Sequence, residues 1–172
     1  MNNRKKVATI AAFFAIVVIW VLVDQLAKSR FAGMVPNGIL AGPFAGIFDI
    51  RLVHNTGGAW GIFSENTMML GVFSLVVCVA LLVFFFATLK QANWLQTVAI
   101  ALVVGGGIGN AIDRFLQGYV TDFIEFSFID FPVFNIADIG VTCGVVLLVA
   151  SLLVEWRKES RLAASELAHE EE

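Results

Sequence analysis

Two aspartates, Asp122 and Asp138, stand among largely apolar neighbours and have no adjacent basic residue. Two carboxyl groups that share a site of low dielectric constant cannot both ionise, so one of them keeps a proton. The ionised group can then take a proton from water while the protonated group supports a carbonyl oxygen. This pair therefore predicts hydrolysis of a peptide bond without a metal ion or a covalent intermediate.

Further polar residues lie at the ends of apolar stretches, namely Asp24, Asn110 and the neighbours Asp113 and Arg114. Ionisable side chains at membrane depth cost several kcal/mol and are usually paired or functional. For Asp113 beside Arg114, a helix end or a structural ion pair is the simpler interpretation. For the two aspartates described above, the apolar surroundings favour a functional site.

The composition of the chain excludes most soluble classes of protein. Of the 172 residues, 59% are hydrophobic and 15% are charged, and the mean hydropathy is +0.86, well above the range of soluble domains. No block of Lys and Arg forms a basic face, so we expect no nucleic acid partner. Cys78 and Cys143 lie inside apolar runs, which predicts two core thiols, and the two histidines are too few for a metal site. We expect neither a metal nor another cofactor.

Four uncharged stretches approach the ~20 residues that a helix needs to cross ~30 Å of hydrocarbon. Hydrocarbon cannot satisfy backbone polar groups, so such stretches span the membrane as helices. The sequence predicts an all-α integral membrane protein with four transmembrane helices, a small extracytoplasmic β element and an interfacial segment, all in a single domain at 1–172. The expected spans are approximately 7–26, 67–89, 95–113 and 138–156.

An even number of spans places both termini on the same side of the membrane. With the termini in the cytoplasm, seven Lys and Arg residues lie inside and four lie outside, which favours this orientation. Arg4, Lys5 and Lys6 before the first apolar run also fit the start of a signal peptide, but the run is too long for one. We therefore expect a multi-pass membrane protein with an outer functional face and a cytoplasmic tail at 157–172.

Two sizeable outer segments, approximately 28–65 and 114–137, are expected to carry the function. In the first, Phe48, Ile50 and Leu52 alternate with the residues between them, which is typical of a strand. We expect a small sheet on the membrane surface there. The second segment contains four phenylalanines, Phe126, Phe128, Phe131 and Phe134. They indicate a segment that dips into the membrane interface.

The start of the fourth span carries a helix-capping pattern. Asn135 stands three residues before Asp138, so Asn135 is the predicted N-cap and Asp138 lies in the first helical turn. The positive end of the helix dipole favours a negative charge there. We therefore predict that Asp138 is the more readily ionised carboxylate and that Asp122 more often holds the shared proton.

Five short motifs follow one another along the chain: Asp24-Gln25-Leu26-Ala27-Lys28, Asn55-Thr56-Gly57-Gly58-Ala59-Trp60, Gly109-Asn110-Ala111-Ile112-Asp113-Arg114, Val120-Thr121-Asp122-Phe123 and Phe134-Asn135-Ile136-Ala137-Asp138. Together they resemble the motifs of bacterial lipoprotein signal peptidase, also called signal peptidase II. The resemblance covers nearly the whole chain, from residue 7 to about residue 156, and the length and span count also fit. Five motifs in register are far more specific than any single motif.

The resemblance implies an aspartic endopeptidase that removes signal peptides from bacterial prolipoproteins, cutting on the amino side of a diacylglyceryl-modified cysteine. It implies that Asp122 and Asp138 are the catalytic pair, at the outer face of the bacterial plasma membrane. We expect lipidated prolipoproteins and membrane lipid as partners, and a monomeric enzyme. Substrate-binding or supporting roles are implied for Asp24, Lys28, Asn55, Gly57, Asn110, Arg114, Asn135 and Ala137.

The chain departs from the commonest family pattern at three positions. Ala27 stands where a hydroxyl residue is frequent, Gly58 where alanine is frequent and Trp60 where phenylalanine is frequent. None of these changes removes a catalytic group, but they affect how the outer segment fits around a substrate.

Two functions of other classes stay open on the sequence. A small proton-coupled transporter would use the membrane carboxylates as a proton relay, although the acidic groups gather at one surface and no repeat is visible. A non-enzymatic assembly factor would use the phenylalanine-rich outer segments for docking, which leaves the aspartate pair unexplained.

Overall fold

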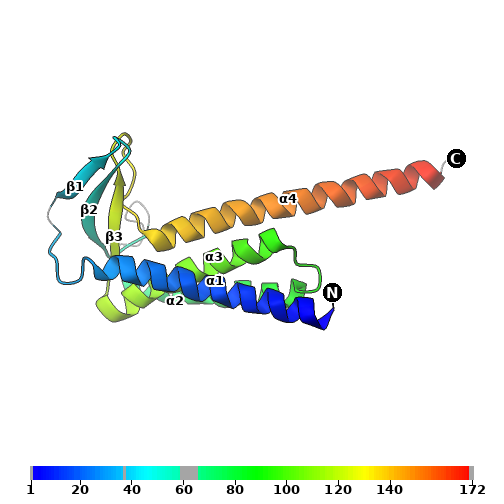
Figure 1. The fold of residues 1–172 in the computed structure, drawn as a ribbon, viewed down its shortest axis with the longest axis horizontal. Coiled ribbons are helices and arrows are strands. Elements are labelled where there is room, and N and C mark those ends of the chain that lie inside the picture. The colour runs from blue at the N-terminus through cyan, green and yellow to red at the C-terminus, as the bar shows by residue number, and fades with distance from the viewer. Residues whose placement is uncertain (1, 37, 59–65, 171–172) are drawn as a thin grey trace.

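The computed structural model describes residues 2–36, 38–58 and 66–170. Within these residues the chain forms four helices and three strands (Figure 1). All four helices are long and apolar enough to cross a membrane, which confirms the predicted four-span fold. The helices are α1 (Asn3–Ser29), α2 (Thr67–Thr88), α3 (Trp94–Gln117) and α4 (Ile136–Glu170).

Helix α3 is the centre of the bundle, and the other three helices pack around it. In its most apolar stretch 67% of the residues are buried, against 17% to 22% in the other helices. The other helices therefore turn most of their apolar side chains outward, as membrane helices surrounded by lipid do. Glycines on α3 allow the close packing, because a side-chain carbon at Gly105 would lie 3.1 Å from Trp20 and one at Gly109 would lie 2.6 Å from Asp24.

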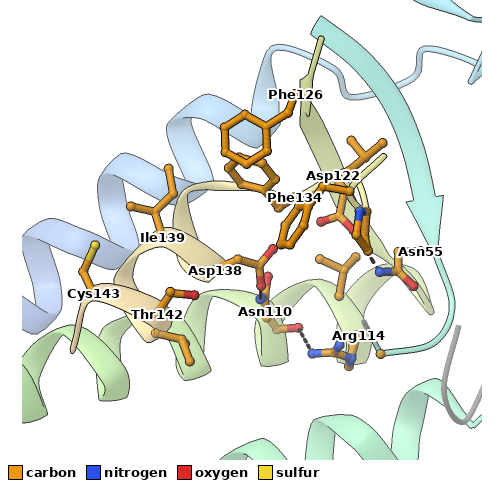
Figure 2. Close-up of a pocket in the computed structure, with 16 residues that line it drawn as sticks. Asn55, Asn110, Arg114, Asp122, Phe126, Phe134, Asp138, Ile139, Thr142 and Cys143 are labelled. Carbon is orange, nitrogen blue, oxygen red and sulfur yellow. Dashed lines mark hydrogen bonds between the residues drawn. The ribbon is translucent and has the colours of Figure 1, made fainter. Parts of the chain in front are cut away.

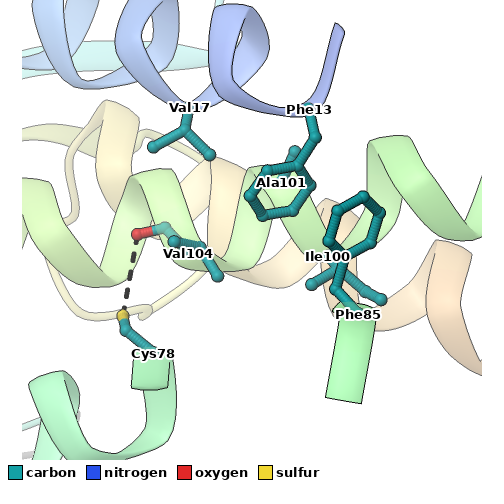
Figure 3. Close-up of a cluster of buried hydrophobic side chains, with 7 residues drawn as sticks. All are labelled: Phe13, Val17, Cys78, Phe85, Ile100, Ala101 and Val104. Carbon is teal, nitrogen blue, oxygen red and sulfur yellow. Dashed lines mark hydrogen bonds between the residues drawn. The ribbon is translucent and has the colours of Figure 1, made fainter. Parts of the chain in front are cut away.

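A cluster of apolar side chains holds α1, α2 and α3 together (Figure 3). The rings of Phe13 and Phe85 stack with their centroids 4.2 Å apart, and both side chains are fully buried. Cys78 lies in the same cluster, with its Sγ 3.7 Å from the carbonyl oxygen of Val104, as expected for a core thiol. The same prediction for Cys143 is wrong, because its apolar run forms a helix with one face turned outward and leaves this thiol exposed.

The two outer segments meet in one antiparallel sheet at one end of the helix bundle. Its strands, in spatial order, are β1 (Ile39–Phe44), β2 (Phe48–Asn55) and β3 (Val120–Phe126). Strand β2 confirms the strand predicted in the first outer segment. Strand β3 comes from the second outer segment, where no strand is predicted from the sequence, because its pairing partner lies far away in the chain.

The alternation of side chains in β2 is interrupted within the strand. The pairing of β2 with β3 shifts register between Ile50 and Val53, and an irregularity of this kind re-aims the side chains that follow it. As a result Asp49 and Leu52 are both buried, although their positions differ by an odd number. The alternation in the sequence therefore identifies the strand, and the irregularity changes which side chains it buries after Ile50.

Several helices extend beyond the spans predicted from hydropathy. Helix α3 ends at Gln117, where Gly118 takes a left-handed conformation with φ of 78° and closes the helix. Helix α4 begins directly after Asn135 and continues to Glu170, through the segment predicted as a solvated tail at 157–172. That segment is rich in strong helix formers, so the helix continues past the apolar span.

The sheet and the chain termini lie at opposite ends of the molecule (Figure 1). The N-terminus and the C-terminal end of α4 both lie on the right of that view, as an even number of membrane crossings requires, and the sheet lies on the left. Trp60, one of the departures from the family pattern, lies outside the described residues.

Candidate active site

Asp122 and Asp138 face one cavity beside the sheet, at the end of the bundle away from the termini (Figure 2). Asp122 comes from the middle of β3 and Asp138 from the first turn of α4. The cavity has a volume of about 500 Å³, and Asp122 is only 2% exposed. Polar and apolar side chains share the lining, which includes Asn55, Asn110, Arg114, Phe126, Phe134 and Ile139.

Asn135 joins the two carboxyl groups. Its Nδ2 donates to Oδ1 of Asp122 at 2.6 Å, and its backbone N–H donates to Oδ2 of Asp138 at 3.0 Å. The N–H of Asp138 donates in return to Oδ1 of Asn135 at 3.0 Å, which makes a reciprocal capping box at the start of α4. The predicted N-cap and the position of Asp138 in the first turn are thus confirmed.

Two further asparagines hold the remaining carboxyl oxygens. Asn55 donates from Nδ2 to Oδ2 of Asp122 at 2.9 Å, and Asn110 donates from Nδ2 to Oδ1 of Asp138 at 2.7 Å. Asn55 is fixed in turn by the backbone N–H of Gly57, which donates to its Oδ1 at 2.9 Å. Hydrogen bonds of this kind favour the charged form of a carboxyl group, so the site can hold a negative charge although it is buried.

Burial raises the pKa of Asp122 from 3.8 to about 7. Loss of solvation is the largest cause, and repulsion by the Asp138 carboxylate adds to it, while hydrogen bonds from Asn55 and Asn135 oppose it. A large share of the molecules therefore holds a proton on Asp122 near neutral pH. One protonated and one ionised carboxyl group are the combination that acid–base hydrolysis needs.

Arg114 brings a positive charge to the cavity wall and, among the described residues, forms no ion pair. Its guanidinium donates to the carbonyl oxygen of Gly57 at 3.3 Å and to that of Asn110 at 3.5 Å. The Nε atom is buried and has no hydrogen-bond partner among the described residues. The cavity wall therefore contains a strong donor as well as the two carboxyl groups.

A buried ion-pair cluster of Asp24, Lys28 and Asp113 lies behind the carboxyl groups. Nζ of Lys28 lies 2.9 Å from Oδ2 of Asp24 and 3.2 Å from Oδ2 of Asp113. Asp113 thus forms a structural ion pair, as the simpler interpretation of the sequence suggests, but its partner is Lys28 on α1 and not its neighbour Arg114. Gln25, which is not among the predicted site residues, donates to both aspartates.

The rest of the cavity wall is apolar. The rings of Phe126, Phe131 and Phe134 pack together with centroids 5.1 to 6.0 Å apart. Phe134 also forms a bridge to Ile124, so the segment after β3 folds back against the strand and covers the cavity. Ile139 of α4 lines the cavity as well (Figure 2). The site therefore combines polar chemistry with a large apolar surface.

His54 lies close to this site but faces elsewhere. Its ring stacks on Tyr119 with the centroids 3.9 Å apart, and His54 is not among the residues that line the cavity. Among the described residues, no three His, Cys, Asp or Glu side chains are grouped so that they could hold a metal ion. The side chains that line the cavity offer carboxyl, amide and guanidinium groups, together with the hydroxyl of Thr142 and the thiol of Cys143.

Comparison with known proteins adds an independent observation. A family model described as signal peptidase (SPase) II matches residues 16–154 of the chain. The chain belongs to the signal peptidase II family. As a member of the signal peptidase II family it is a multi-pass bacterial membrane protein and a peptidase, and the transporter alternative is not supported.

Other signal peptidase II proteins align with almost the whole chain. The lipoprotein signal peptidase of Staphylococcus carnosus (strain TM300) is 39% identical over 153 residues, which are 87% of this chain and 94% of that protein. The lipoprotein signal peptidase of Streptococcus pneumoniae (strain ATCC BAA-255 / R6) is 31% identical over 88% of this chain and 96% of that protein. A solved structure described as a bacterial membrane enzyme at 2.3 Å resolution is 37% identical, with a TM-score of 0.76 over 85% of this chain and 90% of that chain.

The structure brings all the predicted site residues of this signal peptidase II chain to the cavity or directly behind it. Gly57 and Ala137 contribute through their backbones, since Gly57 contacts Asn55 and Arg114, and the N–H of Ala137 donates to Oδ1 of Asp24 at 2.9 Å. The contacts of Gln25 are not evident from the sequence. Its position inside the first motif, beside Asp24, is the signal that could have drawn attention to it.

Proposed function

We propose that this chain is an aspartic endopeptidase that removes signal peptides from bacterial prolipoproteins, with Asp122 and Asp138 as the catalytic pair. Its relatives are lipoprotein signal peptidases, and the cut lies on the amino side of the diacylglyceryl-modified cysteine. The observation that carries the proposal is the convergence of two buried carboxyl groups on one cavity, where Asn135 joins them.

The first step adds water to the scissile carbonyl group. The ionised carboxylate of Asp138 takes a proton from a water molecule, and the oxygen of that water bonds to the carbonyl carbon. At the same time the carbonyl oxygen takes the proton held by Asp122. The product is a neutral tetrahedral diol, and the two aspartates have exchanged their protonation states.

The second step breaks the carbon–nitrogen bond. Asp138 gives its proton to the amide nitrogen, which leaves as the free amine of the modified cysteine. Asp122 takes a proton from one hydroxyl of the diol, and a carboxylic acid forms on the signal peptide. Both aspartates return to their initial states, so the pair is ready for another substrate.

The neighbouring groups support this reaction in different ways. Asn55 and Asn110 hold the carboxyl groups in place through the hydrogen bonds described above. Arg114 has a donor atom, Nε, that no described residue of the chain accepts from, which suits it to bind carbonyl oxygens of the substrate backbone. The apolar remainder of the wall suits the hydrocarbon of a lipid-modified substrate and of its signal peptide.

The site belongs at the outer face of the plasma membrane in this proposal, with both termini in the cytoplasm. The sheet and the site lie at the end of the bundle opposite to both termini, which supports one outer and one inner end. The excess of Lys and Arg on the side of the termini favours that side as the cytoplasmic one. We further propose that the chain acts as a single domain and as a monomer.

Replacement of either catalytic aspartate tests the proposal directly. In purified full-length protein in detergent, Asp122→Asn and Asp138→Asn should each abolish cleavage of a lipidated prolipoprotein, because an amide can neither deprotonate water nor share the proton. Asp113→Asn should have a milder effect, since its side chain contacts the cluster behind the site. Turnover and thermal stability are measured together, to confirm that each variant is folded.

A distant carboxylate serves as the matched control. Glu155 lies on α4 toward the termini, where it accepts a hydrogen bond from Asn93 at 2.7 Å, so Glu155→Gln should cleave like the wild type. The same precursor without its lipid should be a poor substrate for every form. Substantial turnover by Asp122→Asn or Asp138→Asn would show that the pair is not catalytic.

A further inference from the structure

Lys28 on α1 has a set of contacts that helix packing alone does not require. Its Nζ lies 2.9 Å from Oδ2 of Asp24 and 3.2 Å from Oδ2 of Asp113. The same atom donates to Oδ1 of Asn110 at 2.9 Å. An ammonium group has three N–H donors, so each donor has its own acceptor on a buried side chain.

The two aspartates of this cluster hold the backbone next to the catalytic pair. Oδ1 of Asp24 accepts a hydrogen bond at 2.9 Å from the N–H of Ala137, the residue directly before the catalytic aspartate of α4. Oδ2 of Asp113 accepts one at 2.9 Å from the N–H of Thr121, the residue directly before the catalytic aspartate of β3. Hydrogen bonds to a charged acceptor are about twice as strong as neutral ones, so both backbone positions are firmly held.

The third contact of Lys28 reaches the catalytic pair through a side chain. An ammonium group has no acceptor, so Lys28 requires the oxygen of the Asn110 amide to face it. The Nδ2 of Asn110 is therefore turned toward Asp138, to which it donates at 2.7 Å. The Nδ2 of Asn135 donates to the same oxygen at 3.0 Å, so Lys28 and Asn135 together determine which end of this amide meets the catalytic carboxylate.

We propose that Lys28 is a positioning residue, whose single ammonium group sets the relative placement of the two catalytic carboxyl groups through Asp24, Asp113 and Asn110. This inference rests on the proposed catalytic pair. A lysine that served only to join two helices would need one acceptor. Here the three acceptors lead separately to β3, to the start of α4 and to the amide that contacts Asp138.

Loss of the ammonium group would leave Asp24 and Asp113 as two neighbouring buried negative charges. The two carboxylates would repel each other and move apart, and the backbone N–H groups that they hold would move with them. A displacement of about 1 Å at reacting groups costs on the order of a hundredfold in rate. The effect should fall on kcat, because Lys28 is not among the residues that line the cavity.

Steady-state kinetics on a lipidated precursor test this role. We expect Lys28→Met to lower kcat by about a hundredfold and to change KM less than about threefold. Lys28 also lowers the pKa of Asp122, so without it Asp122 should keep its proton to higher pH. The decline of kcat on the alkaline side should then begin at higher pH.

Two further variants keep the test decisive. Lys28→Met with Asp113→Asn removes one charge of each sign and with it the repulsion, so it is the form to compare if the single variant does not fold. Its kcat should still fall, because no ammonium group then holds Asp24 and Asn110. Phe85→Leu is the stability control. Phe85 lies in the apolar cluster with Phe13, so this substitution should lower Tm without lowering kcat.

The proposal is overturned if folded Lys28→Met, or the folded double variant, keeps kcat within about threefold of the wild type. It is also overturned if Phe85→Leu loses kcat to the same extent at the same loss of Tm, since stability alone would then explain the effect. Failure of the proposed function is recognised separately: the wild type would then not cleave the precursor, or Asp138→Asn would retain turnover.

Discussion

At the scale of one residue, the burial of Asp122 determines how the site responds to pH. Its pKa is raised to about 7, and the proposed reaction needs this carboxyl group protonated. We therefore expect kcat to fall as the pH rises through about 7. A profile of kcat between about pH 5 and about pH 9 measures this, and a rate that still rises at the upper end contradicts it.

The division of roles within the pair can be tested by titration. Asp138 receives hydrogen bonds from Asn110 and from the backbone of Asn135 at the positive end of α4, so we expect it to be the more readily ionised member. The protons belong strictly to the coupled pair, so each acid is best titrated alone. Infrared difference spectroscopy can follow this titration in Asp122→Asn and in Asp138→Asn, because each variant keeps only one carboxyl group of the pair.

The expected result is that the acid left in Asp122→Asn ionises at lower pH than the acid left in Asp138→Asn. The reverse order would exchange the roles of the two aspartates in the proposed mechanism. Arg51→Gln is a suitable control, since Arg51 pairs with Glu125 at the exposed side of the sheet and should leave the titration unchanged.

The proposed catalytic pair and its asparagines are visible in the sequence, but their supporting contacts are only partly so. Asp24 and Lys28 are four residues apart on one helix, so their pairing follows from helix geometry. The pairing of Asp113 with Lys28 does not follow, because it depends on how α1 and α3 are rotated against each other. The sequence therefore favours Arg114 as the partner of Asp113, and packing places Lys28 there instead.

At the scale of one element, Asn135 both caps α4 and holds the proposed catalytic pair, and substitutions can separate these roles. A serine keeps an oxygen for the N–H of Asp138 but has no amide to donate to Asp122 and Asn110. We expect Asn135→Ser to keep most of the thermal stability and to lose at least about tenfold in kcat. Asn135→Ala should lose a similar activity and also ~1 kcal/mol of stability with the cap.

Thermal unfolding and turnover of these two variants check this prediction. Asn93 provides the matched control, since it caps α3 by accepting from the N–H of Gln96 at 2.8 Å. Asn93→Ser should therefore have little effect on either quantity. Equal activity of Asn135→Ser and the wild type would limit Asn135 to capping.

Helices and strands can be predicted from the sequence where the pattern that specifies them is local in the chain. The helices are predicted from uncharged length, and the start of α4 from the spacing of Asn135 and Asp138. Strand β3 lacks such a signal, because it is stabilised by pairing with β2, more than sixty residues earlier in the chain. Sequence reasoning therefore places Asp122 in a connecting segment, whereas the sheet is what holds it beside α4.

At the scale of the whole molecule, the arrangement predicts the side on which each segment is accessible. We expect Asn55 and Asp130 on the outer side and Glu170 in the cytoplasm, from the charge bias and the shared end of the termini. In a background without Cys78 and Cys143, a membrane-impermeant maleimide applied to intact cells should label Asp130→Cys and not Glu170→Cys. Labelling of Glu170→Cys from outside would reverse the topology and the proposed side of cleavage.

The hydrogen bond from Ala137 to Asp24 joins the last helix of the chain to the first. A chain is synthesised from its N-terminus, so α1 with Asp24 and Lys28 is made well before α4. The site needs groups from both helices, and Asp138 is among the last of them to be made. A growing chain therefore has no complete site while its earlier helices enter the membrane. If the proposed function holds, a newly made peptidase can cut other membrane proteins only after its own last helix has been inserted.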